Sequence, residues 1–198
     1  MKRILVYSHD TYGLGNIRRI LTLAEHMIEL HEDVSVLLLS GSPMLHAFRV
    51  SPRIDYVKLP CLSRRSDGSY GVKSLGIPYD SIVRMRTALI SSAIADFEPH
   101  VILVDKKPFG VADELRPALE LAARRRERPR LALVLRDILD SPAVTRDAWE
   151  RRGYHEAISR FYDKVLVLGS RSVFDVCSEY AFPTSTAEKV VYCGYLRR

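Results

Sequence analysis

The chain has 198 residues, of which 47% are hydrophobic, and its 30 basic and 24 acidic residues give a net charge of +6. This length can bury one sizeable core but excludes two full domains. No apolar run is long enough to cross a bilayer, and no secretory signal opens the chain. Three scattered cysteines exclude a disulfide or zinc framework. We therefore expect a cytoplasmic protein with a single α/β unit.

Residues 4–30 contain the most informative pattern of the chain. Residues 4–7 form a short apolar run rich in β-formers, which predicts a buried strand. Polar residues 8–11 follow, then the turn Gly13-Leu14-Gly15, then an amphipathic helix over about 16–30. A strand, a glycine loop and a helix in this order hold an anionic or polar ligand at the helix N-terminus in many α/β proteins.

Predicted strands and helices alternate along the rest of the chain. Short apolar runs predict strands at 34–39, 56–59, 101–104, 131–135, 165–168 and 190–193. Helical spacing predicts helices over 80–97 and about 111–122, and a short helix over 43–50 with Ser42 as its N-cap. Residues 60–78 show no periodicity, so they form either a functional loop or a disordered segment. The alternation predicts a Rossmann-like α/β fold, with a mostly parallel sheet and helices on both faces.

Ligands in such sheets bind beyond the carboxyl ends of the strands, so the polar residues at those ends form the predicted site. In chain order they are His9, Asp10, Gly13, Leu14, Gly15, Asn16, Arg18 and Arg19 after the first strand, then Asp105 and Lys106, then Arg136 and Asp137, then Ser170.

Several of these residues also have simpler explanations. Asn16 is a preferred helix N-cap, and Asp137 can pair with Arg136 or Arg146. Lys106 or Lys107 can be solvated surface residues. Trp149 is expected in the core or in packing between domains.

Common cofactor motifs fail in this sequence. The dinucleotide pattern GxGxxG has Arg18 at its third glycine position, and no acidic residue ends the second strand. No P-loop, GxSxG or HExxH motif is present, so we expect no cofactor and no metal on this chain. The arginines at 124–130 complement the dipole of the preceding helix and lack interleaved aromatic residues, which argues against nucleic acid as a partner.

Four segments resemble bacterial predicted glycosyltransferases of the GT-B superfamily, related to the MurG-like group. They are SHDTYGLGNIRR at 8–19, VDKKPFGVADEL at 104–115, LRDILDSPAVTRDAWERRG at 135–153 and VVYCGYLRR at 190–198. The resemblance implies an N-terminal half that binds the acceptor and a C-terminal half that binds a nucleotide sugar. We therefore expect residues 1–198 to be the acceptor-side domain, inactive without its donor-binding partner domain.

The resemblance also implies the chemistry, in which an acceptor hydroxyl attacks the anomeric carbon of an NDP-sugar with the help of a general base. Relatives often carry a histidine after the glycines, where this chain has Asn16. His9 and Asp10 are then the candidate bases, with Asp105 or Asp137 as further candidates from adjacent strands.

Because many relatives act on small or lipid-linked acceptors, contact with the inner face of a membrane is a further hypothesis. Residues 43–50, with Arg53 and Arg64-Arg65, would form a basic and partly apolar patch, although Leu45 and Phe48 also suit a core. Two other functions stay open: a stand-alone Rossmann-like ligand-binding or regulatory domain, and half of a sugar-nucleotide 2-epimerase.

Overall fold

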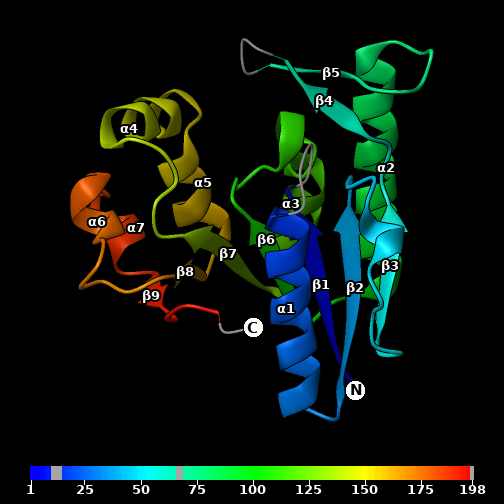
Figure 1. Ribbon diagram of the computed structural model, residues 1–198, viewed down its shortest axis with the longest axis horizontal. Coiled ribbons are helices and arrows are strands. Elements are labelled where there is room, and N and C mark those ends of the chain that lie inside the picture. Colours follow the sequence, from blue (N-terminus) through cyan, green and yellow to red (C-terminus); the bar gives the residue numbers. More distant parts are fainter. Residues whose placement is uncertain (10–14, 66–68, 197–198) are drawn as a thin grey trace.

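Seven parallel strands form the central sheet of the protein, in the order β3-β2-β1-β6-β7-β8-β9 (Figure 1). We describe a computed structural model over residues 1–9, 15–65 and 69–196. The strands are β1 (Lys2–Ser8), β2 (Val34–Ser40), β3 (Ile54–Lys58), β6 (Val101–Asp105), β7 (Arg130–Arg136), β8 (Lys164–Leu168) and β9 (Val190–Tyr192). Every neighbouring pair in this sheet is parallel. The predicted strands are therefore confirmed, including the short ones at both edges.

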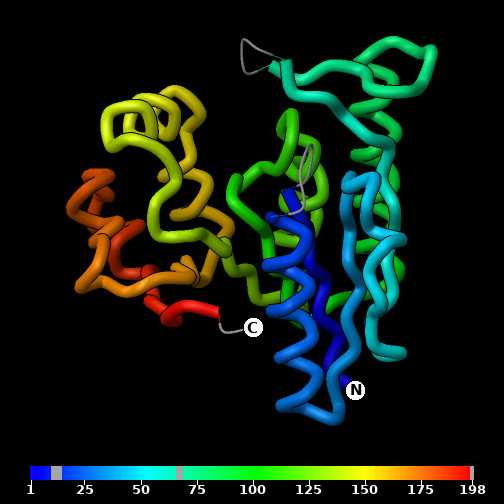
Figure 2. Tube along the Cα trace, viewed as in Figure 1, coloured from blue at the N-terminus to red at the C-terminus, as the bar shows by residue number. Residues whose placement is uncertain are grey.

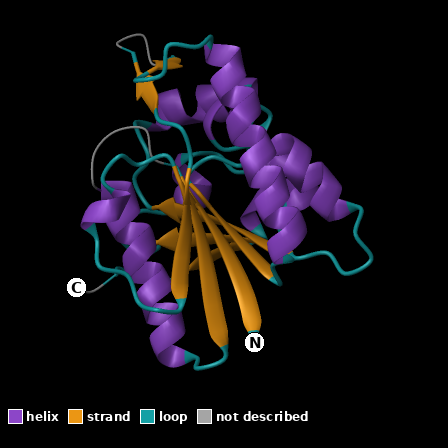
Figure 3. Cartoon of the chain, turned by 90° about the vertical axis from the view of Figure 1, so that its right-hand side faces the viewer, coloured by secondary structure: helices purple, strands orange, loops and turns teal. Residues whose placement is uncertain are grey.

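Helices cover both faces of the sheet, as Figure 3 shows. They are α1 (Gly15–Leu30), α2 (Tyr79–Phe97), α3 (Arg116–Ala123), α4 (Pro142–Arg151), α5 (Tyr154–Phe161), α6 (Val176–Glu179) and α7 (Thr184–Ala187). The buried side chains of α1 pack on one face, and those of α2, α3 and α5 pack on the other. The α/β, Rossmann-like prediction is confirmed.

Strand β1 shows why the middle of each central strand is an unbroken apolar run. Leu5 and Tyr7 point into the cluster that contains α2 and α3, whereas Ile4 and Val6 point into the cluster that contains α1. Successive side chains of a strand face opposite sides, so a strand covered on both faces needs apolar residues throughout.

The predicted helix over 43–50 is wrong. Only a 3₁₀ turn, η1 (Leu45–Ala47), forms there, and its N-cap is Met44 rather than Ser42. The Ser42 hydroxyl instead accepts a hydrogen bond from the Met44 backbone at 3.3 Å, which makes a local turn. Leu45 is buried and Phe48 packs against the same cluster as α1, so both side chains belong to the core.

Within residues 60–78, which lack periodicity, the structure contains a small antiparallel hairpin. Strands β4 (Leu62–Arg64) and β5 (Tyr70–Val72) pair outside the main sheet, with Arg64 opposite Tyr70. Their apolar side packs on Ile82 of α2 and on Val111. Figures 1 and 3 both place this hairpin beyond the carboxyl end of the sheet.

The helix predicted over 111–122 begins later than expected. Gly110, Ala112 and Asp113 have positive φ values, so residues 111–113 form only the 3₁₀ turn η2 (Val111–Asp113), and α3 starts at Arg116.

The last described residues lie beside α1. After β9 the C-terminal segment returns toward α1 (Figure 2), and Leu196 packs against the same cluster as that helix. None of the described helices is long and apolar enough to cross a bilayer.

Candidate functional site

The crevice between β1 and β6 lies where the strand order reverses. The chain adds β2 and β3 on one side of β1, and β7, β8 and β9 on the far side of β6. Such a reversal opens a crevice beyond the strand ends, in which α/β proteins bind ligands. His9 follows β1 and Asp105 ends β6, and the His9 backbone N–H donates to Asp105 Oδ2 at 3.3 Å. The structure thus brings together two residues of the predicted site.

A buried ion pair joins β6 to α1 at this crevice. Asp105 has no exposed surface, and Arg19 Nη2 lies 2.6 Å from its Oδ1. Arg19 also donates to Asn16 Oδ1 at 3.2 Å, and Asn16 Nδ2 donates to the backbone oxygen of His9 at 2.8 Å. Asn16 therefore lies inside α1 and ties that helix to β1, instead of acting as the N-cap that its residue type suggests.

His9 is a buried, neutral imidazole. Burial lowers the pKa of His9 well below its usual range, and the neighbouring cations Lys107 and Lys106 lower it further. His9 Nε2 lies 3.2 Å from the Tyr70 hydroxyl, to which Lys107 Nζ donates at 3.0 Å. The Tyr70 oxygen can accept hydrogen bonds from both Lys107 Nζ and His9 Nε2–H, and in that tautomer the free lone pair of the imidazole lies on Nδ1. His9 Nδ1 is buried and has no hydrogen-bond partner among the described residues.

The two lysines that follow β6 are held in unusual environments. Lys106 has a φ of 69°, a conformation that non-glycine residues rarely adopt. Burial lowers the pKa of Lys106, and the nearby charges of Lys107 and Arg136 add to the effect. Burial also lowers the pKa of Lys107, to about 8, with Arg152 and Arg64 as further causes. Neither lysine is the freely solvated surface residue of the simpler explanation.

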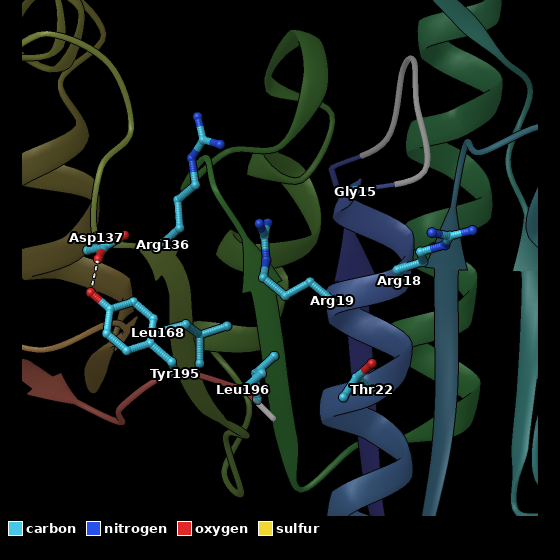
Figure 4. A pocket seen from close by; sticks show the side chains of 9 residues that line it. All are labelled: Gly15, Arg18, Arg19, Thr22, Arg136, Asp137, Leu168, Tyr195 and Leu196. Atoms are coloured by element: carbon cyan, nitrogen blue, oxygen red, sulfur yellow. Dashed lines mark hydrogen bonds between the residues drawn. The ribbon is translucent and has the colours of Figure 1, made fainter. Parts of the chain in front are cut away.

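A cavity of about 290 Å³ lies beside α1, next to the crevice (Figure 4). Its lining comes from α1, from the ends of β7 and β8 and from the C-terminal segment: Gly15, Arg18, Arg19, Thr22, Arg136, Asp137, Leu168, Tyr195 and Leu196. In Figure 4 the guanidinium groups of Arg19 and Arg136 both point toward the carboxyl edge of the sheet. Arg19 Nε is buried and has no hydrogen-bond partner among the described residues.

Asp137 holds the C-terminal segment against this cavity. Its Oδ2 accepts a hydrogen bond from the Tyr195 hydroxyl at 2.7 Å, and its Oδ1 accepts one from the Ile138 backbone at 2.8 Å. Within the described residues Asp137 forms no ion pair, so the alternative pairing with Arg136 or Arg146 is not what the structure shows. Arg136 donates to the Leu139 backbone oxygen instead, at 2.9 Å.

Other predicted residues lie apart from the cavity or outside the description. Ser170 is not part of the cavity lining, and its hydroxyl lies 2.9 Å from that of Ser172. Asp10, Gly13 and Leu14 fall outside the described residues. Trp149 belongs to the core, where its ring stacks on Phe182 at 4.8 Å between centroids. In the part of the chain that the structure describes, no group of acidic, histidine and cysteine residues could hold a metal ion.

The sequence analysis missed two features of this region. Tyr70, which bridges His9 and Lys107, lies in the segment without periodicity, although the dipeptide Asp67-Gly68 in that segment is a turn signal. The second feature is the buried pair of Arg86 with Glu114, which no local pattern indicates.

Comparisons with known proteins show the fold but not a family. No protein-family model matches the chain, and no curated protein matches it in sequence. A UGT transferase from Siraitia grosvenorii in complex with UDP matches with a TM-score of 0.59 at 13% identity, over 97% of this chain and 50% of that one. MurG from Acinetobacter baumannii matches with a TM-score of 0.55 at 10% identity, over 100% of this chain and 46% of that one.

A UDP-GlcNAc 2-epimerase from Methanocaldococcus jannaschii matches with a TM-score of 0.58 at 8% identity, over 98% of this chain and 46% of that one. This chain therefore spans about half the length of each of these structures. Its Rossmann-like fold matches one half of a GT-B fold, as the sequence resemblance implied.

Proposed function

We propose that this chain is the acceptor-binding half of a nucleotide-sugar-dependent glycosyltransferase of the GT-B class, close to the MurG-like group. One observation carries the proposal: a chain with the fold of one GT-B half presents a polar crevice and an adjoining cavity at the carboxyl edge of its sheet. Its partner is a C-terminal donor domain, and its ligand is a small or lipid-linked acceptor. The donor is an NDP-sugar held by that second domain.

In the proposed reaction the acceptor oxygen forms a bond to the anomeric carbon of the sugar, and the bond from that carbon to the nucleoside diphosphate breaks. The acceptor hydroxyl loses its proton to a base within hydrogen-bond reach. We assign this role to His9, because its imidazole is neutral and its Nδ1 has no partner in the described part of the chain.

The two acidic candidates that the structure describes are occupied by contacts of their own. The carboxylate of Asp105 lies against Arg19 and the His9 backbone, and that of Asp137 lies against Tyr195. We propose that Asp105 acts as a positioning residue, which fixes His9 and the start of α1 relative to each other.

A 2-epimerase is the second candidate, because 2-epimerases match this chain over the same share of its length as the transferases do. Both candidates need a second domain, so the test begins by reading the gene past the codon for Arg198 and expressing the whole product. UDP-GlcNAc is added with and without a lipid and sugar extract of the source cells. Release of UDP that depends on the extract supports the transferase, whereas conversion of UDP-GlcNAc to its 2-epimer without extract contradicts it.

The substitution His9→Ala tests the assigned base in that whole product. We expect kcat to fall by about 10²–10⁴-fold, because general-base catalysis contributes on that order. His26→Ala is the matched control, since the His26 side chain is 62% exposed on α1, and we expect it to leave kcat unchanged. If both substitutions lower kcat equally, or if His9→Ala leaves kcat unchanged, His9 is not the general base. If the gene product shows neither reaction and only binds a small ligand, the chain is a binding domain.

A further inference from the structure

Five cations from four segments converge beyond the ends of β6 and β7. Arg64 ends β4, Lys106 and Lys107 follow β6, Arg136 ends β7, and Arg152 follows α4. Arg64 is paired opposite Tyr70, whose hydroxyl accepts from Lys107 Nζ at 3.0 Å. The Lys106 backbone N–H donates to the Val134 oxygen of β7 at 2.9 Å, two residues before Arg136. In line with this geometry, and in addition to burial, Arg136 and Arg64 lower the pKa of Lys106, and Arg152 and Arg64 lower that of Lys107. None of the five forms an ion pair with any described carboxylate. We call these five residues the cation cluster.

Acidic residues nearby do not neutralise the cation cluster. Asp105 is paired with Arg19 at 2.6 Å, so its charge is already balanced. Asp113 acts on Lys107, but its carboxylate also lies 3.8 Å from Arg116. Unlike a solvated surface arginine, Lys106 and Lys107 are half-buried, and their charged forms are disfavoured by that burial. Among the described residues, the nearby carboxylates therefore leave an excess of positive charge at the cation cluster.

A buried polar group points to a ligand at the same place. Tyr70 receives a hydrogen bond from Lys107 and contacts His9 Nε2, so the hairpin, β1 and the β6 loop meet at one hydroxyl. His9 is 4% exposed, and its Nδ1 has no partner among the described residues. A buried polar atom without a partner costs free energy, and the hydroxyl group of an incoming ligand would satisfy it by donating to Nδ1.

We propose that the cation cluster binds a phosphate or diphosphate group carried by the acceptor. A phosphate oxyanion matches the mixture of lysine point charges and arginine forks, whereas an uncharged sugar would leave the charges of the cluster unbalanced. The word "acceptor" in this inference rests on the proposed function, but the anion site itself does not.

The test titrates the 198-residue chain with inorganic diphosphate, followed by calorimetry and by ³¹P NMR line width. We expect saturable binding at low salt. Arg64→Gln and Lys107→Gln should each weaken it by about tenfold, since a charge-assisted hydrogen bond contributes on that order. Arg64 is exposed, so its substitution leaves the fold intact even if that of Lys107 does not.

The matched control is the double substitution Arg124→Gln and Arg126→Gln. These arginines are exposed beyond the end of α3 and near the start of β7, at the opposite edge of the sheet, and the control removes more charge than either test variant. We expect it to change the affinity by less than about twofold. Equal loss in the control and the test variants would mean that only net charge attracts diphosphate, and the site would be rejected. Absence of saturable binding would reject it as well.

A vesicle co-sedimentation experiment distinguishes a lipid-borne phosphate group from a soluble one. Phosphatidylcholine vesicles with and without phosphatidic acid are sedimented with the chain, and Arg64→Gln is run in parallel. Capture that needs phosphatidic acid and Arg64 indicates a lipid-borne phosphate, whereas diphosphate binding without capture indicates a soluble one. Because the titration needs no donor domain, diphosphate binding without transferase activity would overturn the proposed function and leave the anion site standing. Transferase activity without diphosphate binding would reject the anion site and leave the proposed function standing.

Discussion

Lys107 is a residue whose charge can be changed within an accessible pH range. Burial and the charges of Arg152 and Arg64 bring its pKa from 10.5 to about 8, while Asp113 opposes them and Tyr70 accepts its hydrogen bond. Below that pKa the side chain is an ammonium that attracts an anion, and above it the side chain is a neutral amine. Diphosphate binding should therefore weaken as the pH rises through about 8.

The substitution Lys107→Arg removes this pH step, because a guanidinium stays protonated throughout the range. At about pH 7 we expect the substituted and unsubstituted chains to bind diphosphate about equally. At about pH 9 the unsubstituted chain should bind up to about tenfold more weakly than the Lys107→Arg chain. The ratio of the two affinities cancels the ionisation of diphosphate itself. A ratio that does not change with pH would mean that Lys107 does not contact the anion.

Between elements, the buried pair of Arg86 with Glu114 links α2 to the segment before α3. Arg86 Nη2 and the Tyr7 hydroxyl each donate to Glu114 Oε1 at 2.6 Å, and both charged side chains have 1% exposure or less. Glu114→Gln should lower the free energy of unfolding by about 3–5 kcal/mol, because it leaves the Arg86 charge buried without a counter-charge. Urea denaturation measures this loss.

The control for Glu114→Gln is Asp147→Asn, which breaks the exposed pair of Asp147 with Arg151 on α4. We expect it to cost less than about 1 kcal/mol, since exposed pairs contribute little. Similar losses in the free energy of unfolding for the two substitutions would show that the buried pair stabilises the fold no more than the exposed one.

The turn that precedes η2 depends on Gly110. Its φ is +73°, and a Cβ added there would lie 2.8 Å from the Tyr7 hydroxyl. Gly110→Ala should therefore destabilise the fold by about 1–3 kcal/mol through backbone strain, and by more if Tyr7 has to move. Gly76→Ala is the control, because a Cβ at Gly76 meets nothing within 4 Å. A thermal melt of each variant distinguishes the two, and an unchanged Tm for Gly110→Ala would contradict the geometry.

For the whole molecule, the two cores share the strands of one sheet. Leu5 belongs to the core on the side of α2 and Val6 to the core on the side of α1, although they are adjacent in β1. We expect the chain to unfold in one cooperative transition. Leu5→Ala and Val6→Ala should both shift that transition, with near-UV and far-UV circular dichroism changing together. Separate transitions for the two signals would show that the cores unfold independently.

The sheet could be predicted from sequence because its strands are buried on both faces and read as continuous apolar runs. Local turns were harder to predict from the sequence. Residues 43–50 favour a helix by composition, but the Ser42 hydroxyl closes a turn there. The hairpin was not predicted, because strands as short as β4 and β5 contain too few residues to show alternation of apolar and polar side chains. The late start of α3 follows from positive φ values at Ala112 and Asp113, which no residue preference indicates.

The candidate site was predictable only in part. Strand ends placed His9, Asp105 and Arg136 at one edge, because parallel strands point their carboxyl ends the same way. The pairing of Arg19 with Asp105 joins residues 86 positions apart, and the contact of His9 with Tyr70 spans 61 positions. Partners at such separations are chosen by the packing of whole elements, so the sequence alone could not assign them.

The hairpin of β4 and β5 forms a sheet of its own and brings Arg64 and Tyr70 to the crevice without sharing a strand with the main fold. Its apolar side is fixed on Ile82 and Val111, but an exposed position such as Arg64 can change its charge while the seven-stranded scaffold keeps its packing. Directed evolution toward a new ligand would start most economically with this hairpin.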